Sequence, residues 1–408
     1  MAESLKPRNA AEVEQAVNWA IAGGKTLEIV GRGSKRLIGR AAQWDMTLDL
    51  SGLSGVTLYE PAELVLSARA GTPLSEIEAL LVASGQELAF EPMDYGPLLG
   101  GAVGDATIGG VLASNLSGPR RIKAGAARDH FLGVTAVSGR GETFKSGGRV
   151  VKNVTGYDLC KLLAGSWGTL AAMTDVTVKT LPRAETEQTV LVLGLDEAAA
   201  GKLMTAVMGS FADTSAAAHV PPPLAERIAE TATAGTSVSA FRLEGVAPSV
   251  THRQAVLEEL ARPHGMLGAL EETRSRAFWR AVRDATPFAA AGPAGGRDVW
   301  RISTAPARGA EIGRVLAGQV GAEVLYDWAG GLIWAALPPS DDAGSGLVRS
   351  VVATAGGHAT LIRAPAAVRA AVDVFPPEAQ ALAALTRRVR ESFDPRGVLN
   401  PGRMWAGV

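Results

Sequence analysis

The stretch that decides the fold runs from Thr107 to Asp129 and reads TIGGVLASNLSGPRRIKAGAARD. It holds almost no side chain that can act as an acid, a base or a nucleophile. It offers glycines, small hydroxyls, one amide and a few cations. Glycine lets the backbone approach a ligand closely and adopt positive φ, and successive backbone N–H groups in such turns form concavities that bind anions. The stretch therefore predicts a binding site for a large phosphorylated cofactor.

The composition limits the classes of protein that remain. A chain of 408 residues is long for one core, so two domains are expected. The net charge of −1 gives no basic excess, which argues against a nucleic-acid partner. Cys160 is the only cysteine, which excludes an intrachain disulfide and any cluster or zinc site built from several cysteines of this chain. A single cysteine also fits a reducing compartment, so we expect a cytoplasmic protein.

No segment of the sequence predicts export or membrane insertion. The first residues, MAESLKPRNAAEVEQAV, contain no charged region followed by an apolar run, so no secretory signal is expected. No run of 18 uncharged apolar residues occurs either. Any membrane contact is therefore expected to be peripheral and to depend on a partner.

The pattern of elements changes at Pro182. Before it, the sequence predicts helices at 9–23, 73–84 and 157–164, and strands at 26–30, 46–50, 56–58, 64–69, 132–138, 142–146 and 169–181. After it, strands at 188–195, 236–244, 298–304, 322–327 and 331–337 alternate with helices at 196–210, 248–262, 274–285, 307–318, 345–355 and 378–392. The second half thus predicts an antiparallel sheet covered by helices, and the fold class is α+β.

Several common site motifs are incomplete. Gly24-Lys25-Thr26 lacks the upstream glycine of a P-loop, and Arg36 stands where the Rossmann fingerprint needs its third glycine. Ala164 replaces the first glycine of a nucleophile elbow at 164–168. None of the five histidines has the spacing of a metal-binding pair. The sequence therefore names no catalytic residue and no metal ligand.

Four blocks in order resemble the FAD-binding fold of the vanillyl-alcohol oxidase and p-cresol methylhydroxylase superfamily. They are Val30–Lys35 with Gly39, Ala106–Asp129, Gly156–Leu159 with Gly165–Thr174, and Phe393–Gly402. The resemblance implies a two-part FAD-binding domain at 1–182, an α+β cap domain at 183–375, and a C-terminal segment at 376–408 that returns to the flavin. It implies the following cofactor-binding residues: Gly31, Arg32, Gly33, Ser34, Lys35, Ala106, Thr107, Ile108, Gly109, Gly110, Ser114, Asn115, Gly118, Gly168, Thr169, Met173 and Asn400.

The residue types in these blocks suit a flavin nucleotide. The backbone N–H groups of 32–35 and 108–110 can neutralise a diphosphate without a helix dipole. Ser34, Ser114 and Asn115 can bond phosphate or ribityl oxygens. For Arg121, Arg128 and Asp129 a solvated or structural ion pair is an equal alternative, and Asn400 can instead end a helix before Pro401. Relatives with covalent FAD use a histidine or cysteine in defined loops; 31–39 contains neither, so we expect non-covalent FAD.

The cap carries a second resemblance and a departure from it. Hydroxy-acid-oxidising relatives have a motif His-x-Gly-Asp-Gly-x-x-His that helps to hold a metal, and here Asp327 and Trp334 stand at its histidine positions. A tryptophan cannot ligate a metal. The pattern is similar to the accessory FAD-binding subunits of glycolate oxidase, which implies a catalytic FAD subunit and an iron–sulfur subunit as partners. The alternatives are a stand-alone 2-hydroxy-acid dehydrogenase that orients its substrate through Arg242 or Arg301, and a scaffold whose flavin site has decayed. For Trp328 and Trp334, core packing is favoured over an interface role.

Overall fold

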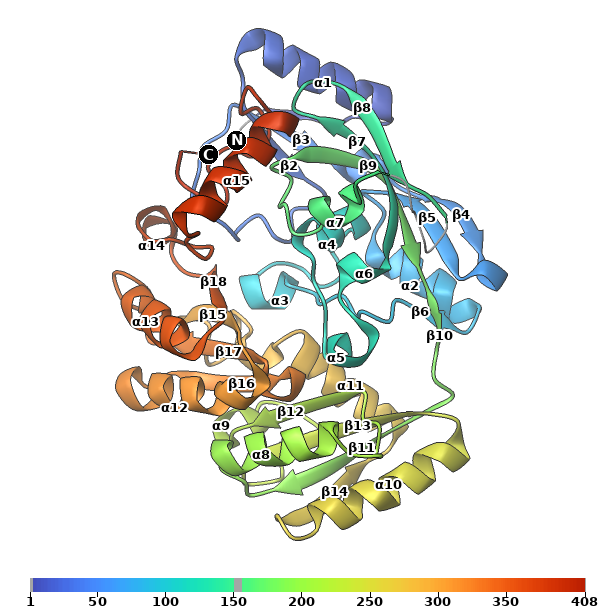
Figure 1. Ribbon diagram of the computed structural model, residues 1–408, viewed down its shortest axis with the longest axis vertical. Coiled ribbons are helices and arrows are strands. Elements are labelled where there is room, and N and C mark those ends of the chain that lie inside the picture. The colour runs from blue at the N-terminus through green and yellow to red at the C-terminus, as the bar shows by residue number, and fades with distance from the viewer. Residues whose placement is uncertain (1–2, 150–155, 408) are drawn as a thin grey trace.

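The computed structural model describes residues 3–149 and 156–407. The chain forms an N-terminal part and a cap that lie one above the other in Figure 1, and the C-terminal segment returns to the N-terminal part. No helix in the described ranges is both long and apolar enough to cross a membrane.

The N-terminal part is built on two main sheets. A three-stranded parallel sheet has the order β1 (Ser4–Leu5), β3 (Met46–Asp49), β2 (Leu27–Val30). A five-stranded antiparallel sheet has the order β4 (Val56–Glu60), β5 (Val65–Arg69), β9 (Ala171–Lys179), β7 (Phe131–Ser138), β8 (Thr143–Gly147). A short pair joins β6 (Gln86–Glu87) to β10 (Leu181–Pro182). The helices of this part are α1 (Ala10–Gly23), α2 (Leu74–Ala83), α3 (Gly96–Leu99), α4 (Ile108–Ser114), α5 (Arg121–Ala124), α6 (Ala127–His130) and α7 (Leu159–Leu163).

Helix α1 shows how the sequence fixes these elements. Asn9 caps its start by accepting a hydrogen bond from the Glu12 N–H at 2.9 Å, and Gly24 ends it at φ +60°. Its buried face, Val13 and Val17 among others, packs in a small core with residues of β2, β3, β7 and β9. That core also contains Val398 and Leu399, so the C-terminal segment belongs to it.

The cap is one eight-stranded antiparallel sheet. Its order is β14 (Met266–Leu270), β11 (Thr186–Leu193), β13 (Val238–Gly245), β12 (Ala216–Val220), β16 (Glu323–Asp327), β17 (Leu332–Leu337), β15 (Asp298–Ser303), β18 (His358–Arg363). Its helices are α8 (Glu197–Met208), α9 (Pro222–Ala225), α10 (Ala247–Ala261), α11 (Glu272–Arg283), α12 (Gly309–Val320), α13 (Ser345–Ala355) and α14 (Ala366–Ala371). In Figure 1, α8, α10, α12 and α13 lie on the outer side, and α11 lies between the sheet and the N-terminal part.

The C-terminal segment contains α15 (Gln380–Phe393) and then follows β2. Leu399 pairs with Leu27 as a parallel bridge, and the Leu27 N–H donates to the Val398 carbonyl at 2.8 Å. Figure 1 shows α15, in red, beside the blue strands of the N-terminal part. The α+β fold expected from the sequence is confirmed. The domain boundaries after residues 182 and 375 stay a prediction.

Candidate functional site

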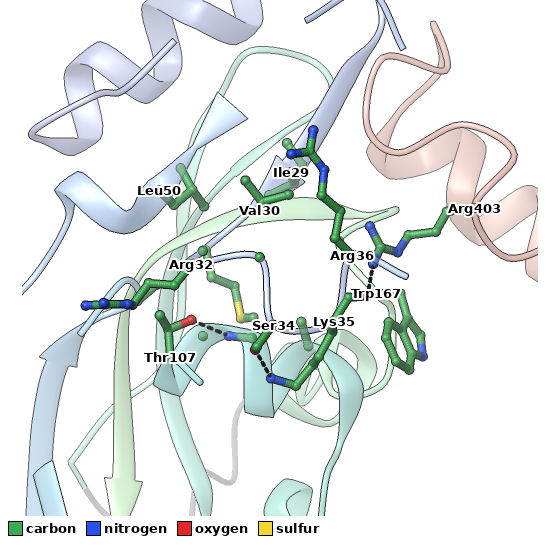
Figure 2. A pocket seen from close by; sticks show the side chains of 18 of the residues that line it. Ile29, Val30, Arg32, Ser34, Lys35, Arg36, Leu50, Thr107, Trp167 and Arg403 are labelled. Carbon is green, nitrogen blue, oxygen red and sulfur yellow. Dashed lines mark hydrogen bonds between the residues drawn. The ribbon is translucent and has the colours of Figure 1, made fainter. Parts of the chain in front are cut away.

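An open cavity with an empty volume of about 700 Å³ lies at the end of β2. Figure 2 shows its walls, which come from β2 and the loop after it, the start of α4, the turn before β9, and the C-terminal segment. It is lined by Ile29, Val30, Gly31, Arg32, Gly33, Ser34, Lys35, Arg36, Leu50, Ala70, Thr107, Gly109, Gly110, Ala113, Trp167, Gly168, Ala171, Met173 and Arg403.

The loop after β2 presents its backbone to this cavity. Among the described residues, the N–H groups of 32–35 have no hydrogen-bond acceptor. Gly33 adopts φ +80°, which glycine tolerates best. A Cβ at Gly31 would lie 2.5 Å from the Thr107 hydroxyl oxygen, so a side chain there would push the loop away from α4. Consecutive unpaired N–H groups in a glycine-containing loop form the kind of concavity that binds a phosphate.

The start of α4 differs from the expectation that residues 108–110 present free amides outside any helix. Ile108 N–H donates to the Thr72 carbonyl at 3.0 Å and Gly109 N–H to the Ala70 carbonyl at 2.8 Å. Thr107 caps the helix by accepting from Gly110 N–H at 3.3 Å. The expectation was wrong because a glycine pair predicts a loop, whereas the Thr107 cap and the buried apolar face of α4 stabilise a helix. A Cβ at Gly109 would lie 2.7 Å from that of Ala70, so this glycine permits close packing.

Four cations line the cavity and no carboxylate does. Arg32 pairs with Asp105 at 3.0 Å, and Arg36 pairs with the buried Glu28. Lys35 and Arg403 make no ion pair within the described chain. Burial lowers the pKa of Lys35 to about 8 and that of Arg403 to about 10. The wall therefore holds two cations without an ion pair in the described chain, which suits an anionic ligand.

Asn400 supports the cavity from behind without lining it. Its side-chain oxygen accepts from Ile29 N–H at 2.8 Å, and its side-chain nitrogen donates to the Trp167 carbonyl at 2.8 Å. Both Ile29 and Trp167 line the cavity, so the hydrogen bonds of Asn400 join two of its walls. Asn400 adopts φ +45° in a turn before Pro401, but it ends no helix, because α15 ends at Phe393.

The predicted cofactor residues divide into two groups. Those that line the cavity are Gly31, Arg32, Gly33, Ser34, Lys35, Thr107, Gly109, Gly110, Gly168 and Met173; those outside its lining are Ala106, Ile108, Ser114, Asn115, Gly118, Thr169 and Asn400. The Ser114 hydroxyl donates to the Gly110 carbonyl at 2.6 Å, within its own helix. The Asn115 side-chain oxygen accepts from Arg128 N–H at 3.0 Å. Their contact with a cofactor stays a prediction.

Sequence reasoning missed several lining residues. They are Ile29, Val30, Arg36, Leu50, Ala70, Ala113, Trp167, Ala171 and Arg403. Arg403 follows directly after the quoted tail motif that ends at Gly402, and this position is the signal from which it could have been predicted. Val30, Ala113, Trp167 and Ala171 lie inside the quoted blocks, but apolar side chains there are equally expected in the core.

The hairpin at 327–334 packs in the core, as expected from the sequence for Trp328 and Trp334. Trp328 is 4% exposed and Trp334 is 1% exposed. The Trp328 indole N–H donates to the Gly118 carbonyl at 2.9 Å, which gives Gly118 a contact between the cap and the N-terminal part. Burial raises the pKa of Asp327 to about 7. No group of three or more His, Cys, Asp or Glu suited to a metal occurs in the described ranges.

The two candidate substrate-orienting arginines differ in their surroundings. Arg242 is buried, makes two hydrogen bonds of 2.8 Å to Glu91, and lies 4.9 Å from the Trp279 ring centre, so its guanidinium is already occupied. Arg301 lies 5.0 Å from the Trp328 ring centre and makes no ion pair or side-chain hydrogen bond with the described residues. Arg121 lies over the same ring, 4.4 Å from its centre, and not in an ion pair with Asp129.

Comparison with known proteins identifies the family of this chain. Residues 3–147 match a family described as an FAD binding domain. The chain is 32% identical over 400 residues to the glycolate oxidase subunit GlcE of Escherichia coli, and the match covers 96% of both chains. It is 42% identical to the glycolate oxidase subunit GlcD of Bacillus subtilis over 88 residues, which is 22% of this chain and 19% of that protein.

Solved structures agree on the fold. The structure of p-cresol methylhydroxylase with substrate bound superimposes with a TM-score of 0.75 at 13% identity, covering 98% of this chain and 88% of that one. At this identity the likeness concerns the fold alone. The full-length match and the flavin-binding domain carry the assignment: the chain belongs to the family of FAD-binding oxidoreductases that includes the glycolate oxidase subunit GlcE.

Proposed function

We propose that this chain is the accessory FAD-binding subunit of a glycolate oxidase complex, which oxidises glycolate to glyoxylate. The match to GlcE over nearly the whole of both chains is the observation that carries the proposal. FAD, when bound, supplies a carrier for the two electrons that leave a 2-hydroxy acid on oxidation. The chain's own contribution is the cavity at the end of β2, with its unpaired N–H groups at 32–35 and its two unpaired cations.

The same cavity supports non-covalent binding of FAD. No histidine or cysteine is among its lining residues. Cys160 lies buried in α7, and burial raises the pKa of its thiol to about 11, which keeps it protonated and poorly nucleophilic. A flavin that remains with the protein after acid precipitation would contradict this part of the proposal.

The partners in this proposal are a catalytic FAD subunit and an iron–sulfur subunit. Buried Asp327 and Trp334 stand where hydroxy-acid-oxidising relatives have metal-binding histidines. With one cysteine, the chain cannot build its own iron–sulfur cluster. We therefore assign it an electron-relay or structural role. The complex belongs in the cytoplasm in this proposal, with at most peripheral contact to the inner face of the membrane.

One observation favours a second candidate function. Arg301 lies on β15 and makes no ion pair with a described residue, and arginine is well suited to bind a carboxylate. This arrangement fits a stand-alone dehydrogenase of D-2-hydroxy acids. Arg242, the other residue considered for this task, is engaged by Glu91.

Anaerobic reduction of the flavin separates the candidates. The purified chain is mixed with glycolate or D-lactate, with and without the partner subunits, and the visible flavin absorption is recorded. Bleaching only in the presence of partners supports the accessory role. Bleaching of the chain alone supports the stand-alone enzyme. A chain that binds no flavin under any condition contradicts both and leaves the scaffold.

A further inference from the structure

Arg403 joins the C-terminal segment to the loop after β2. One terminal guanidinium nitrogen donates to the Lys35 carbonyl at 2.9 Å, and the Arg403 carbonyl accepts from Arg40 N–H at 2.9 Å. Gly39 packs so closely on this backbone that an added Cβ would lie 2.9 Å from the Arg403 carbonyl oxygen. Figure 2 shows the Arg403 side chain reaching toward Lys35 beside Trp167. Arg403, a residue of the C-terminal segment, thus bonds at two points to the loop that carries the free N–H groups.

The bonding of Arg403 is incomplete. The residue is 5% exposed, and its Nε is buried without a hydrogen-bond partner in the described chain. Its guanidinium lies 5.7 Å from the Trp167 ring centre, and the other cation without a carboxylate, Lys35, donates only to the Ser34 hydroxyl at 3.2 Å. A buried guanidinium without an anion is costly. Both cations at this loop therefore lack an ion pair within the described chain, and an anionic ligand would supply one.

We propose that Arg403 is a positioning residue that couples docking of the C-terminal segment to binding of the diphosphate of the cofactor. It bonds the loop 31–40 at Lys35 and Arg40, and it adds a second cation without an ion pair behind that loop. The proposal rests on the flavin site proposed above. Because coupling between two sites is reciprocal, the ligand must also stabilise docking of residues 400–407.

The first test compares ligands on the full-length chain freed of flavin. Binding of FAD, ADP and riboflavin is titrated for wild type, Arg403→Met and Arg403→Lys, with Arg396→Met as the control because Arg396 is exposed in the same segment. Arg403→Met should bind FAD and ADP about tenfold more weakly, as expected for one charge-assisted contact, and riboflavin equally well. Arg403→Lys should recover part of the loss, and Arg396→Met should show none. Equal losses for riboflavin and ADP would show a purely structural role and overturn the proposal.

The second test needs no variant. Hydrogen exchange of residues 396–407 is followed in the wild-type chain with and without FAD, and with ADP alone. Both ligands should slow exchange in this segment. Unchanged exchange on binding of FAD overturns the coupling while leaving the proposed function intact. Failure of the wild-type chain to bind FAD at all refutes the flavin site itself.

Discussion

Gly110 is the residue at which a single side chain should close the cavity. A Cβ there would point toward the cavity, 3.2 Å from the Thr107 hydroxyl and 3.6 Å from the Lys35 ammonium. Gly110→Glu places a carboxylate where it neutralises Lys35 and repels a diphosphate. We expect the variant to purify without flavin, as read from its visible absorption. The control is Gly318→Glu in α12, where an added Cβ meets nothing within 4 Å; stoichiometric flavin in Gly110→Glu would contradict the assignment.

Lys35 should make cofactor affinity depend on pH. Burial lowers its pKa to about 8 in the free protein, so the ammonium is present below that pH and is lost above it. A bound diphosphate favours the charged form, and FAD affinity should therefore be constant below pH 8 and fall as pH rises further, by at most about tenfold per pH unit. Fluorescence titration of FAD between about pH 6.5 and 9.5 checks this. Lys35→Met should bind weakly with a flat profile, and a wild-type profile that is flat across this range contradicts the role of Lys35.

Asp327 should make the folded state less stable as pH rises. Burial raises its pKa from 3.8 to about 7, so between these values the folded state binds more protons than the unfolded one. Stability is lost over this window and is constant above it. Asp327→Asn keeps an oxygen for the Trp328 N–H, at 2.7 Å in the structure, and removes the titration. We expect it to match wild type near pH 4 and to gain roughly 2–4 kcal/mol at pH 8 in urea unfolding; equal stability at pH 8 would contradict the expectation.

Individual elements were predictable where the sequence shows a period. Helix α1, strand β2 and the strands β15–β17 agree with the expected ranges to within a few residues. Strand β12 was missed because Ala216–Val220 is buried on both faces, so it shows no alternation, and alanine has low strand propensity. Strand β14 was missed because Gly268 interrupts a short apolar run. Helix α4 was missed because its glycine pair opposes a helix that tertiary packing supports.

The candidate site was predictable only in part, because some of its residues are brought together by contacts between distant parts of the chain. The glycine-rich loops carry local marks in the sequence, so Gly31–Lys35 and Gly109–Gly110 were found. The bonds that join distant elements leave no local mark. Asn400 lies 371 positions from Ile29, and only the folded chain shows that it bonds that residue.

The bond between β2 and the C-terminal segment should be needed for flavin retention. Asn400→Ala removes the acceptor for Ile29 N–H and the donor to the Trp167 carbonyl. We expect a loss of about 1–3 kcal/mol in unfolding free energy, because both backbone groups lie at a partly buried junction. Asn400→Asp keeps the acceptor but turns a buried carboxylate oxygen toward the Trp167 carbonyl, so it should lose at least as much. Flavin content after gel filtration should follow the same order; full retention in Asn400→Ala would show that the cavity walls hold without this bond.

At the scale of the molecule, the cavity is assembled from both ends of the chain, and the cap is joined to that assembly by buried charges. Arg120 and Glu91 belong to the N-terminal part, and Arg242 and Glu244 lie on β13. Arg242 bonds Glu91 at 2.8 Å, and the Arg120 Nε bonds Glu244 at 3.0 Å. The two pairs cross the interface in opposite directions. Arg120 also pairs with Glu87 of its own part at 3.0 Å, and Arg242 with Glu244 of its own strand at 3.4 Å, so the interface is crossed by one buried network of charges.

Glu91→Gln should therefore lower the unfolding free energy of the whole molecule and not only the local stability of its own loop. The substitution leaves Arg242, 1% exposed, without its bidentate carboxylate, and breaking a buried pair in this way costs about 3–5 kcal/mol. Urea unfolding should show that loss, with separate transitions for the cap and the N-terminal part if the pair is what makes them unfold together. Glu311→Gln is the control, because its pair with Arg308 is exposed and should change stability by less than about 0.5 kcal/mol. The double variant Glu91→Met with Arg242→Met should recover only part of the loss, because it removes both charges of the pair but also the acceptor of the Arg120 N–H. A Glu91→Gln variant as stable as wild type would mean that apolar packing, and not this pair, joins the cap to the cofactor-binding part.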